Sequence, residues 1–190
     1  MLPDIYMKKF ILICFAMLGI QQSMPAQSHF SFGLGYFGKN LDNAGLVVQF
    51  EYEKFHAGSV SLPLRANLGH FSNPDYQALF IDFHKGFRKH FSGGLFIEQS
   101  LGAGLITKKY NTGMWYVDKY AQSVLHNNQS TWGFMPSVTA GVGYNFGKNN
   151  KGDDLLWIRP KVYWDLGFRA LYLPYWALQI GFTHTFSLKY

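Results

Sequence analysis

The chain has 190 residues and a formal net charge of +6, and it contains 18% aromatic but only 15% charged residues. About a quarter of the residues are charged in typical soluble domains, so this composition is unusual for a soluble domain. The positive residues are scattered along the sequence, whereas nucleic-acid-binding chains gather them into runs, so we expect no nucleic-acid partner.

Residues 1–26 have the layout of a secretory signal peptide. Lys8 and Lys9 precede an apolar run over residues 10–20, which is too short for a membrane span, and small residues follow it. The pattern predicts cleavage after residue 26 or, alternatively, after residue 28; a retained N-terminal anchor is the other alternative. The only cysteine, Cys14, lies in the apolar run. We therefore expect a mature chain without disulfides, thiolate chemistry or a cysteine-bound metal.

Residues 29–190 contain eight segments in which apolar and polar side chains alternate, and a period of two is typical of β-strands. The predicted strands cover residues 29–36, 46–53, 59–69, 79–88, 95–105, 132–146, 156–166 and 178–190. The longest irregular segment between them covers residues 108–130. Pro136 and Pro160 fall inside predicted strands, and because proline has no N–H group to donate, we expect local bulges there.

The last predicted strand shows the alternation most clearly. Strands of soluble domains usually run for about 5–6 residues, whereas a tilted strand that crosses a bilayer needs about 9–11. The alternation here lasts for the whole of residues 178–190, and one face carries Leu178, Ile180, Phe182, His184, Phe186, Leu188 and Tyr190. The sequence therefore predicts an all-β fold, an eight-stranded antiparallel up-and-down transmembrane β-barrel over residues 29–190.

The order of short and long connections agrees with this fold. If the chain enters from the periplasm, the long segment after the fifth strand is external, and the turns after the second, fourth and sixth strands are periplasmic. Long external loops and short periplasmic turns are typical of outer-membrane barrels. The alternative is a soluble barrel of lipocalin type with an apolar interior. It is disfavoured because the polar face carries mostly Gly, Ser, Thr and Asn and few charged residues.

In this architecture and in its alternating C-terminal strand, the chain resembles the small eight-stranded outer-membrane barrel family, the OmpA membrane domain and OmpX-like porin-family proteins. The resemblance implies the outer membrane of a Gram-negative-type cell envelope as the location. It also implies that the barrel-assembly machinery reads the last strand, at the matching positions Phe186, Leu188 and Tyr190. We further expect a monomer in contact with membrane lipids and lipopolysaccharide, with a structural or surface-interaction role.

Charged residues of both signs fall on the polar face of the predicted strands. An eight-stranded barrel is just wide enough for side chains to fill, and an unpaired charge inside it would be costly. The sequence therefore predicts a plug of ion pairs in the lumen. An alternative is a narrow pore or small-molecule transporter, opened by Gly102, Gly104, Gly141 and Gly143. The predicted lumen network consists of Glu51, Glu53, Arg65, Asp82, Arg88, Glu98, Arg159, Lys161 and Asp165.

Residues 70–73, His-Phe-Ser-Asn, resemble the His-x-Ser-Asn motif of the outer-membrane lipid A deacylase family. That resemblance implies Ser72 as a nucleophile and His70 as its base, as acyl transfer requires, with Asp75 as a substitute for the supporting acid. The alternative is a simple turn, since Ser-Asn-Pro-Asp is a common turn composition. We expect the turn, and no catalysis.

The remaining aromatic and histidine residues are assigned to structural roles. We expect Tyr36, Trp132, Trp164, Tyr175 and Trp176 at the membrane interface. The 108–130 segment could meet a partner or lipopolysaccharide phosphates, or could belong to the same girdle, through Trp115, Tyr116, Tyr120, Lys108, Lys109 and Lys119. The isolated residues His84 and His184 are expected to be structural, so we predict neither a metal site nor a cofactor.

Overall fold

The computed structural model describes residues 28–39, 43–57, 59–111, 114–117, 124–127, 130–147, 154–167 and 174–186. The predicted signal peptide, residues 1–26, lies outside the described residues, as do Leu188 and Tyr190. No helix in the described part of the chain has the length and apolar character needed to cross a membrane.

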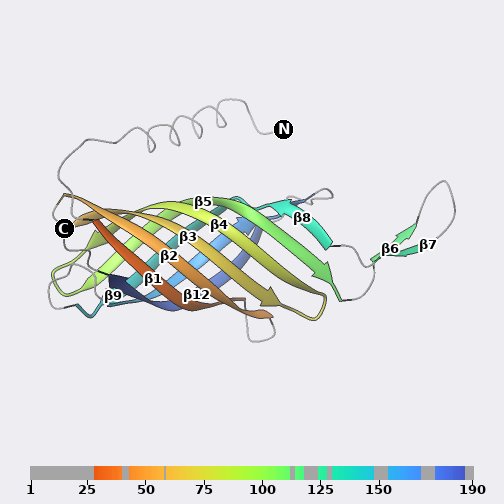
Figure 1. Cartoon of the computed structure of the whole chain (residues 1–190), viewed down its shortest axis with the longest axis horizontal. Helices are drawn as coiled ribbons and strands as arrows, with labels where there is room; N and C mark the ends of the chain where they lie inside the picture. The colour runs from red at the N-terminus through yellow and green to blue at the C-terminus, as the bar shows by residue number, and fades with distance from the viewer. Residues whose placement is uncertain are drawn as a thin grey trace, which may run out of the picture.

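The described residues form twelve strands, which alternate in direction around one closed wall apart from a separate hairpin, β6–β7 (Figure 1). Their bounds are β1 Ser28–Gly38, β2 Ala44–Ala57, β3 Val60–Ser72, β4 Tyr76–His90, β5 Leu95–Tyr110, β6 Met114–Val117, β7 Val124–Asn127, β8 Ser130–Phe134, β9 Ser137–Asn145, β10 Asp154–Trp164, β11 Leu166–Gly167 and β12 Pro174–Phe186.

The first and last strands pair with each other and close the sheet into a barrel. Leu34 of β1 lies opposite Val48 of β2 on one side and opposite Phe182 of β12 on the other. Strands β8 and β9 both pair with β5 and together form one position in the wall, and β11 continues β10 in the same way. The wall thus has eight strand positions, which confirms the predicted eight-stranded antiparallel barrel.

The two faces of the wall have the polarity of a membrane barrel. Phe50 of β2 faces outward and is 57% exposed, whereas the adjacent Glu51 faces inward and is 2% exposed. The same alternation runs through the burial patterns of β3, β4 and β5. An apolar outer surface of this extent needs a non-aqueous environment. The lipocalin-type alternative, which requires an apolar interior and a polar exterior, is wrong.

The interior also holds large rings, among them Phe80, Phe96 and Trp157. Space for them comes from inward-facing glycines, where an added Cβ atom would collide with a neighbouring side chain. Four of these glycines are the ones that the pore alternative needed: Gly102 lies against His84, Gly104 against Asp82, Gly141 against Arg159, and Gly143 against Phe96. These glycines therefore accommodate large side chains and do not leave an open passage.

The prolines inside strands cause gaps in the hydrogen-bond ladder, and the predicted bulges are wrong. Beside Pro160, Ile158 of β10 pairs with Val142 and Lys161 pairs with Thr139 of β9. Two residues lie between these pairs on both strands, so the register is unchanged across the gap. The same holds beside Pro136, where β8 gives way to β9 along β5, and beside Pro63, between β3 and β4. A two-residue gap removes the need for the missing N–H donor without rotating any side chain to the other face.

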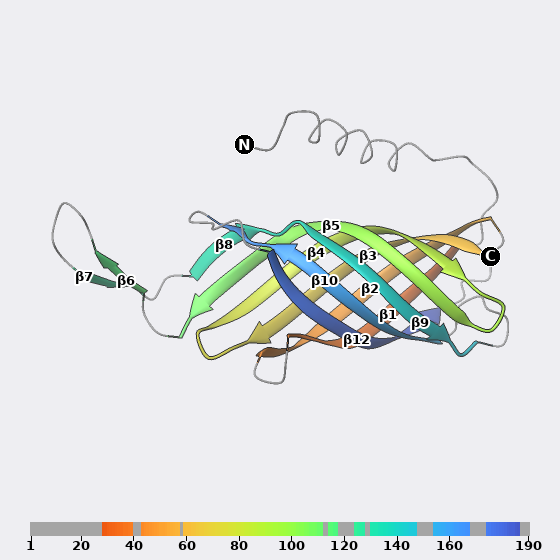
Figure 2. The same cartoon turned by 180° about the vertical axis from the view of Figure 1, so that it is seen from behind.

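The barrel has two distinct ends. The start of β1 and the end of β12 lie at one of them, here called the terminal end, and the β6–β7 hairpin projects from the other, here called the hairpin end (Figure 2). Strand β5 continues to Tyr110, so the long irregular segment begins later than predicted. At the terminal end, a tight turn joins β4 to β5: Phe91 N donates to Leu95 O over 2.8 Å, and Gly94 has a φ of +85°.

Candidate functional site

The middle of the lumen is organised around the guanidinium of Arg88, on β4. Its Nη1 atom donates to Glu51 Oε1 over 2.8 Å and to Glu53 Oε2 over 2.9 Å. Its Nη2 and Nε atoms donate to Glu98 Oε2, over 2.7 and 2.8 Å. All four side chains are buried. One cation therefore binds three carboxylates from two other strands, β2 and β5.

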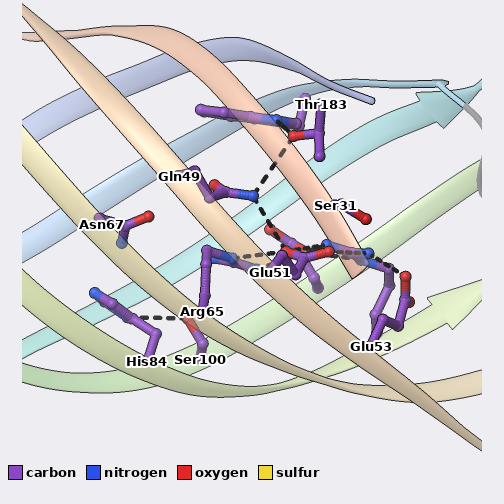
Figure 3. A network of polar contacts seen from close by, with 12 residues as sticks. Ser31, Gln49, Glu51, Glu53, Arg65, Asn67, His84, Ser100 and Thr183 are labelled. Carbon is purple, nitrogen blue, oxygen red and sulfur yellow. Dashed lines mark hydrogen bonds and ion pairs between the residues drawn. The ribbon is translucent and has the colours of Figure 1, made fainter. Parts of the chain in front are cut away.

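Two further arginines complete the neutralisation of these carboxylates. Arg65 of β3 donates from Nε to Glu51 over 2.9 Å and from Nη2 to Glu98 over 3.0 Å. Arg159 of β10 donates from Nε to Glu98 and from Nη1 to Gln49 Oε1, the latter over 2.5 Å. Figure 3 shows Arg65 reaching Glu51 from the neighbouring strand β3, and Gln49 reaching it from two residues earlier on β2 itself. The contacts of Arg159 cross the lumen, because β10 pairs with neither β2 nor β5.

A second polar group lies nearer the hairpin end, around the carboxylate of Asp82. Lys161 Nζ donates to Asp82 Oδ2, and Asn67 Nδ2 donates to Asp82 Oδ1 over 2.7 Å. The ring of His84 lies 3.3 Å from Asp82 through Nε2 and 3.2 Å from Ser100 Oγ through Nδ1. His84, expected to be an isolated structural residue, is thus part of a hydrogen-bonded cluster.

These groups form a set of charges that balances within itself. We define the lumen network as four carboxylates and four cations: Glu51, Glu53, Asp82, Glu98, Arg65, Arg88, Arg159 and Lys161. Each is at most 6% exposed. Buried charges are stable only when they are paired and hydrogen-bonded, and here the formal charges sum to zero. The described part of the lumen is therefore blocked by its own side chains across several strands.

Aromatic rings cover the lumen network at both ends. Toward the terminal end, Arg88 lies 4.7 Å from the centre of the Phe96 ring. Ser61 Oγ donates to Glu53 there, and His90 Nε2 lies 3.1 Å from the same carboxylate. Phe96 is fully buried. Such rings exclude water and stabilise the adjacent cations through their electron-rich faces.

Toward the hairpin end, the cover consists of Phe37 and Phe80. Their ring centres are 4.7 Å apart, and Lys161 Nζ lies 5.8 Å and 5.0 Å from them. Phe71 packs against Phe37 at 5.3 Å. The lumen therefore contains an ionic layer under an aromatic layer.

Beyond the aromatic layer, a separate ion pair lies at the hairpin end. Lys108 Nζ is 2.5 Å from Asp165 Oδ2 and 4.8 Å from the ring centres of both Tyr76 and Tyr175. Lys108, expected in the irregular segment, belongs to β5 and is 4% exposed. Asp165, expected in the lumen network, pairs with Lys108 at the mouth. Tyr175, expected at the membrane interface, instead stacks on the buried Tyr163 at 5.5 Å.

A cavity of about 290 Å³ opens at this end of the barrel, above the aromatic layer. Half of its twelve lining residues are aromatic, and four others are polar or charged. We call it the mouth cavity; among its lining residues are Phe37, Phe71, Tyr76, Tyr163, Tyr175, Trp176, Lys39, Asn43, Asn73 and Asp75. Sequence reasoning had not grouped these residues, because they come from four separate turns and strand ends.

The residues of the deacylase-like motif lie at the end of β3 and in the turn that follows it. His70 and Ser72 both fall on the outer face of β3, and the structure places no hydrogen bond between them within its described ranges. Asn73 Oδ1 accepts the backbone N–H of Asp75 over 2.9 Å and that of Tyr76 over 2.8 Å. The motif therefore makes the β3–β4 turn, as expected. The described residues hold no group of three His, Cys, Asp or Glu placed to bind a metal.

Aromatic side chains on the outer face gather near both ends. At the hairpin end, Trp132 is 66% exposed, and Trp176 is also exposed, with Lys39 Nζ 5.3 Å from its ring. Tyr36 and Trp164 are half-buried on the same outer face. At the terminal end the sequence interpretation missed a second group of paired rings: Phe30 with Tyr52, and Tyr144 with Phe146. Phe186, the described member of the expected assembly signal, is exposed at that end.

Trp157 is the largest interior residue that the sequence interpretation left without a role. It is fully buried between Gly35 and Gly181, and its Nε1 donates to Thr183 Oγ1 over 2.8 Å. The guanidinium of Arg159 lies 3.9 Å from its ring centre. The signal that could have identified it is an inward tryptophan facing two glycines.

No protein-family profile and no curated protein sequence matches the chain. Solved structures do. Neisserial surface protein A aligns with a TM-score of 0.52 and 6% identity, over 87% of this chain and all of that one. Ail, the attachment invasion locus protein of Yersinia pestis, solved with the heparin analogue sucrose octasulfate, aligns with a TM-score of 0.53 and 12% identity, over 86% of this chain and all of that one. Both are small outer-membrane barrels. At these identities the likeness concerns the fold: the chain has the eight-stranded barrel fold of these proteins.

Proposed function

We propose that the protein is a non-catalytic outer-membrane β-barrel with a sealed lumen, which acts through the surface that it presents outside the cell. The observation that carries this proposal is the lumen network, eight buried charges that neutralise one another and are covered by rings at both ends. A channel needs a hydrated path, and the network fills that path. The hydrogen bonds that Asn73 accepts in the turn after Ser72 support a structural role for the motif over a hydrolytic one.

The outer wall supports the proposed location in the outer membrane. Large apolar side chains cover it, and aromatic residues gather near both ends, as in membrane barrels. Residues 1–26 are proposed to direct export, with cleavage after residue 26 or 28. Phe186, Leu188 and Tyr190 would then present the assembly signal, and the wall would contact membrane lipids and lipopolysaccharide as a monomer.

The orientation is proposed from the two ends. The terminal end carries the tight turn after β4, and the hairpin end carries the longer β5–β8 connection with β6 and β7. Short periplasmic turns and long external connections are the rule in outer-membrane barrels. The hairpin end, with the mouth cavity, therefore faces outward.

Cysteine labelling tests location and orientation together. Cys14 lies in the proposed signal peptide, so an introduced cysteine would be the only one in the mature chain. Asp75→Cys lies in the β3–β4 turn at the hairpin end, and Gly93→Cys is its matched control in the turn at the terminal end; both positions are exposed. We expect a membrane-impermeant maleimide to label Asp75→Cys on intact cells, and Gly93→Cys only after the outer membrane is permeabilised. The reverse pattern, or recovery of both variants in the soluble fraction, would contradict the proposal.

A further inference from the structure

We propose that the mouth cavity is a binding site for one uncharged sugar ring. The outward direction of this site rests on the proposed orientation, whereas binding itself depends only on the cavity. The argument uses its size, its aromatic wall, its rigid polar rim and its balance of charge.

The size of the cavity fits a small ring. Small-molecule sites usually have volumes of about 300–1,000 Å³, and the mouth cavity, at about 290 Å³, lies at the lower end of that range. The aromatic layer of Phe37 and Phe80 closes it from below. A bound molecule would therefore stay at the mouth and would not pass into the lumen.

The aromatic wall is held in place by ring-to-ring packing. Tyr163 stacks on Tyr175 with an angle of 19° between the ring planes. Phe71 meets Tyr76 edge-on, at 6.1 Å and 74°. Rings with fixed positions bury apolar area with little loss of conformational freedom. The ring surface that these contacts leave open to the cavity attracts the C–H groups on the apolar side of a sugar ring.

The polar rim is rigid as well. Asn111 Nδ2 donates to the backbone oxygens of Asn73 and Pro74, over 3.3 and 3.1 Å, and so ties the end of β5 to the β3–β4 turn. This turn also holds the two hydrogen bonds that Asn73 Oδ1 accepts. Asp75, Asn73 and Asn43 are all among the residues that line the cavity. A carboxylate that accepts two hydroxyl groups, next to amide groups, suits the neighbouring hydroxyls of a sugar.

The charges of the site favour an uncharged ligand. Lys39 and Asp75 line the cavity with opposite charges. Lys108 is already neutralised by Asp165, and its ammonium occupies the neighbourhood of the Tyr76 and Tyr175 rings. The ammonium of Lys108 would repel a cationic ligand, and the carboxylate of Asp75 would repel a phosphorylated or sulfated sugar.

Saturation-transfer NMR on the full-length mature barrel in detergent micelles tests the site. The probes are methyl β-galactopyranoside and N-acetylglucosamine, with glucose 6-phosphate as the charged comparison. We expect saturation transfer from the wild-type protein to at least one of the neutral sugars. We expect the affinity for that sugar to fall about tenfold in both Tyr175→Ala and Asp75→Ala, since a tenfold change corresponds to one or two lost contacts. Trp132→Ala is the matched control, because this exposed ring lies at the same end but on the outer face; it should bind as the wild type does.

Three results would overturn the site: no transfer to either neutral sugar, transfer that both cavity variants retain in full, or stronger transfer to glucose 6-phosphate. Heat-dependent gel mobility of each variant establishes that the barrel is folded. Because the purified protein has both ends open to solvent, this measurement is independent of orientation. Binding with inverted cysteine labelling would refute only the proposed orientation, and correct labelling without binding would refute only the sugar site.

Discussion

Arg88 is the residue on which the interior depends most, because its guanidinium binds Glu51, Glu53 and Glu98. In Arg88→Met, these three carboxylates remain buried with fewer partners. Removal of one member of a buried ion pair typically costs about 3–5 kcal/mol. We expect the free energy of unfolding in urea, measured on the protein in micelles, to fall by about that amount.

Lys89→Met is the matched control for this substitution. Lys89 is the next residue of β4, and its Nζ donates to Ser59 Oγ over 2.6 Å outside the lumen network. Such half-exposed contacts contribute about 1 kcal/mol or less. Equal losses in the two variants would show that the lumen network contributes nothing particular to stability.

At the scale of single strands, the fold depends on glycines that face large side chains. In Gly181→Ala, the new Cβ atom of β12 would meet the ring of Trp157. Overpacking of an interior typically costs about 1–3 kcal/mol. We expect the urea midpoint of Gly181→Ala to fall accordingly, whereas Gly93→Ala, where an added Cβ would have nothing within 4 Å, should change it little. Unchanged stability in Gly181→Ala would refute this account of the glycines.

The strands of the barrel wall could be predicted from the sequence, whereas β6 and β7 fall in the segment predicted to be irregular. Each strand position has one of two environments, because the wall faces an apolar surrounding on one side and a crowded polar lumen on the other. The alternation of residues 46–53 therefore placed Glu51 and Glu53 in the lumen, where the structure has them. The end of β5 could not be predicted, because Lys108 and Lys109 are typical of a loop. Lys108 is buried only because Asp165, far away in sequence, lies beside it.

At the scale of the whole molecule, the partners of the interior charges could not be predicted either. Alternation predicts which face of the wall each residue occupies, but it predicts neither the position of the residue along the barrel axis nor its neighbour across the lumen. Arg159 meets Gln49 because barrel closure brings β10 opposite β2. The mouth cavity was missed for the same reason, since Tyr163, Asp75 and Phe37 come together only when the barrel is closed.

The central claim, that the lumen is sealed by its own charges, is tested most directly by recording from the purified protein in planar lipid bilayers. Heat-dependent gel mobility of the reconstituted protein establishes that folded barrels are present. The account predicts a current that stays at the level of the bare bilayer, without discrete steps, because eight mutually neutralised side chains and the rings above and below them occupy the path. Stable, ion-selective conductance steps would contradict it and would make the protein a narrow pore.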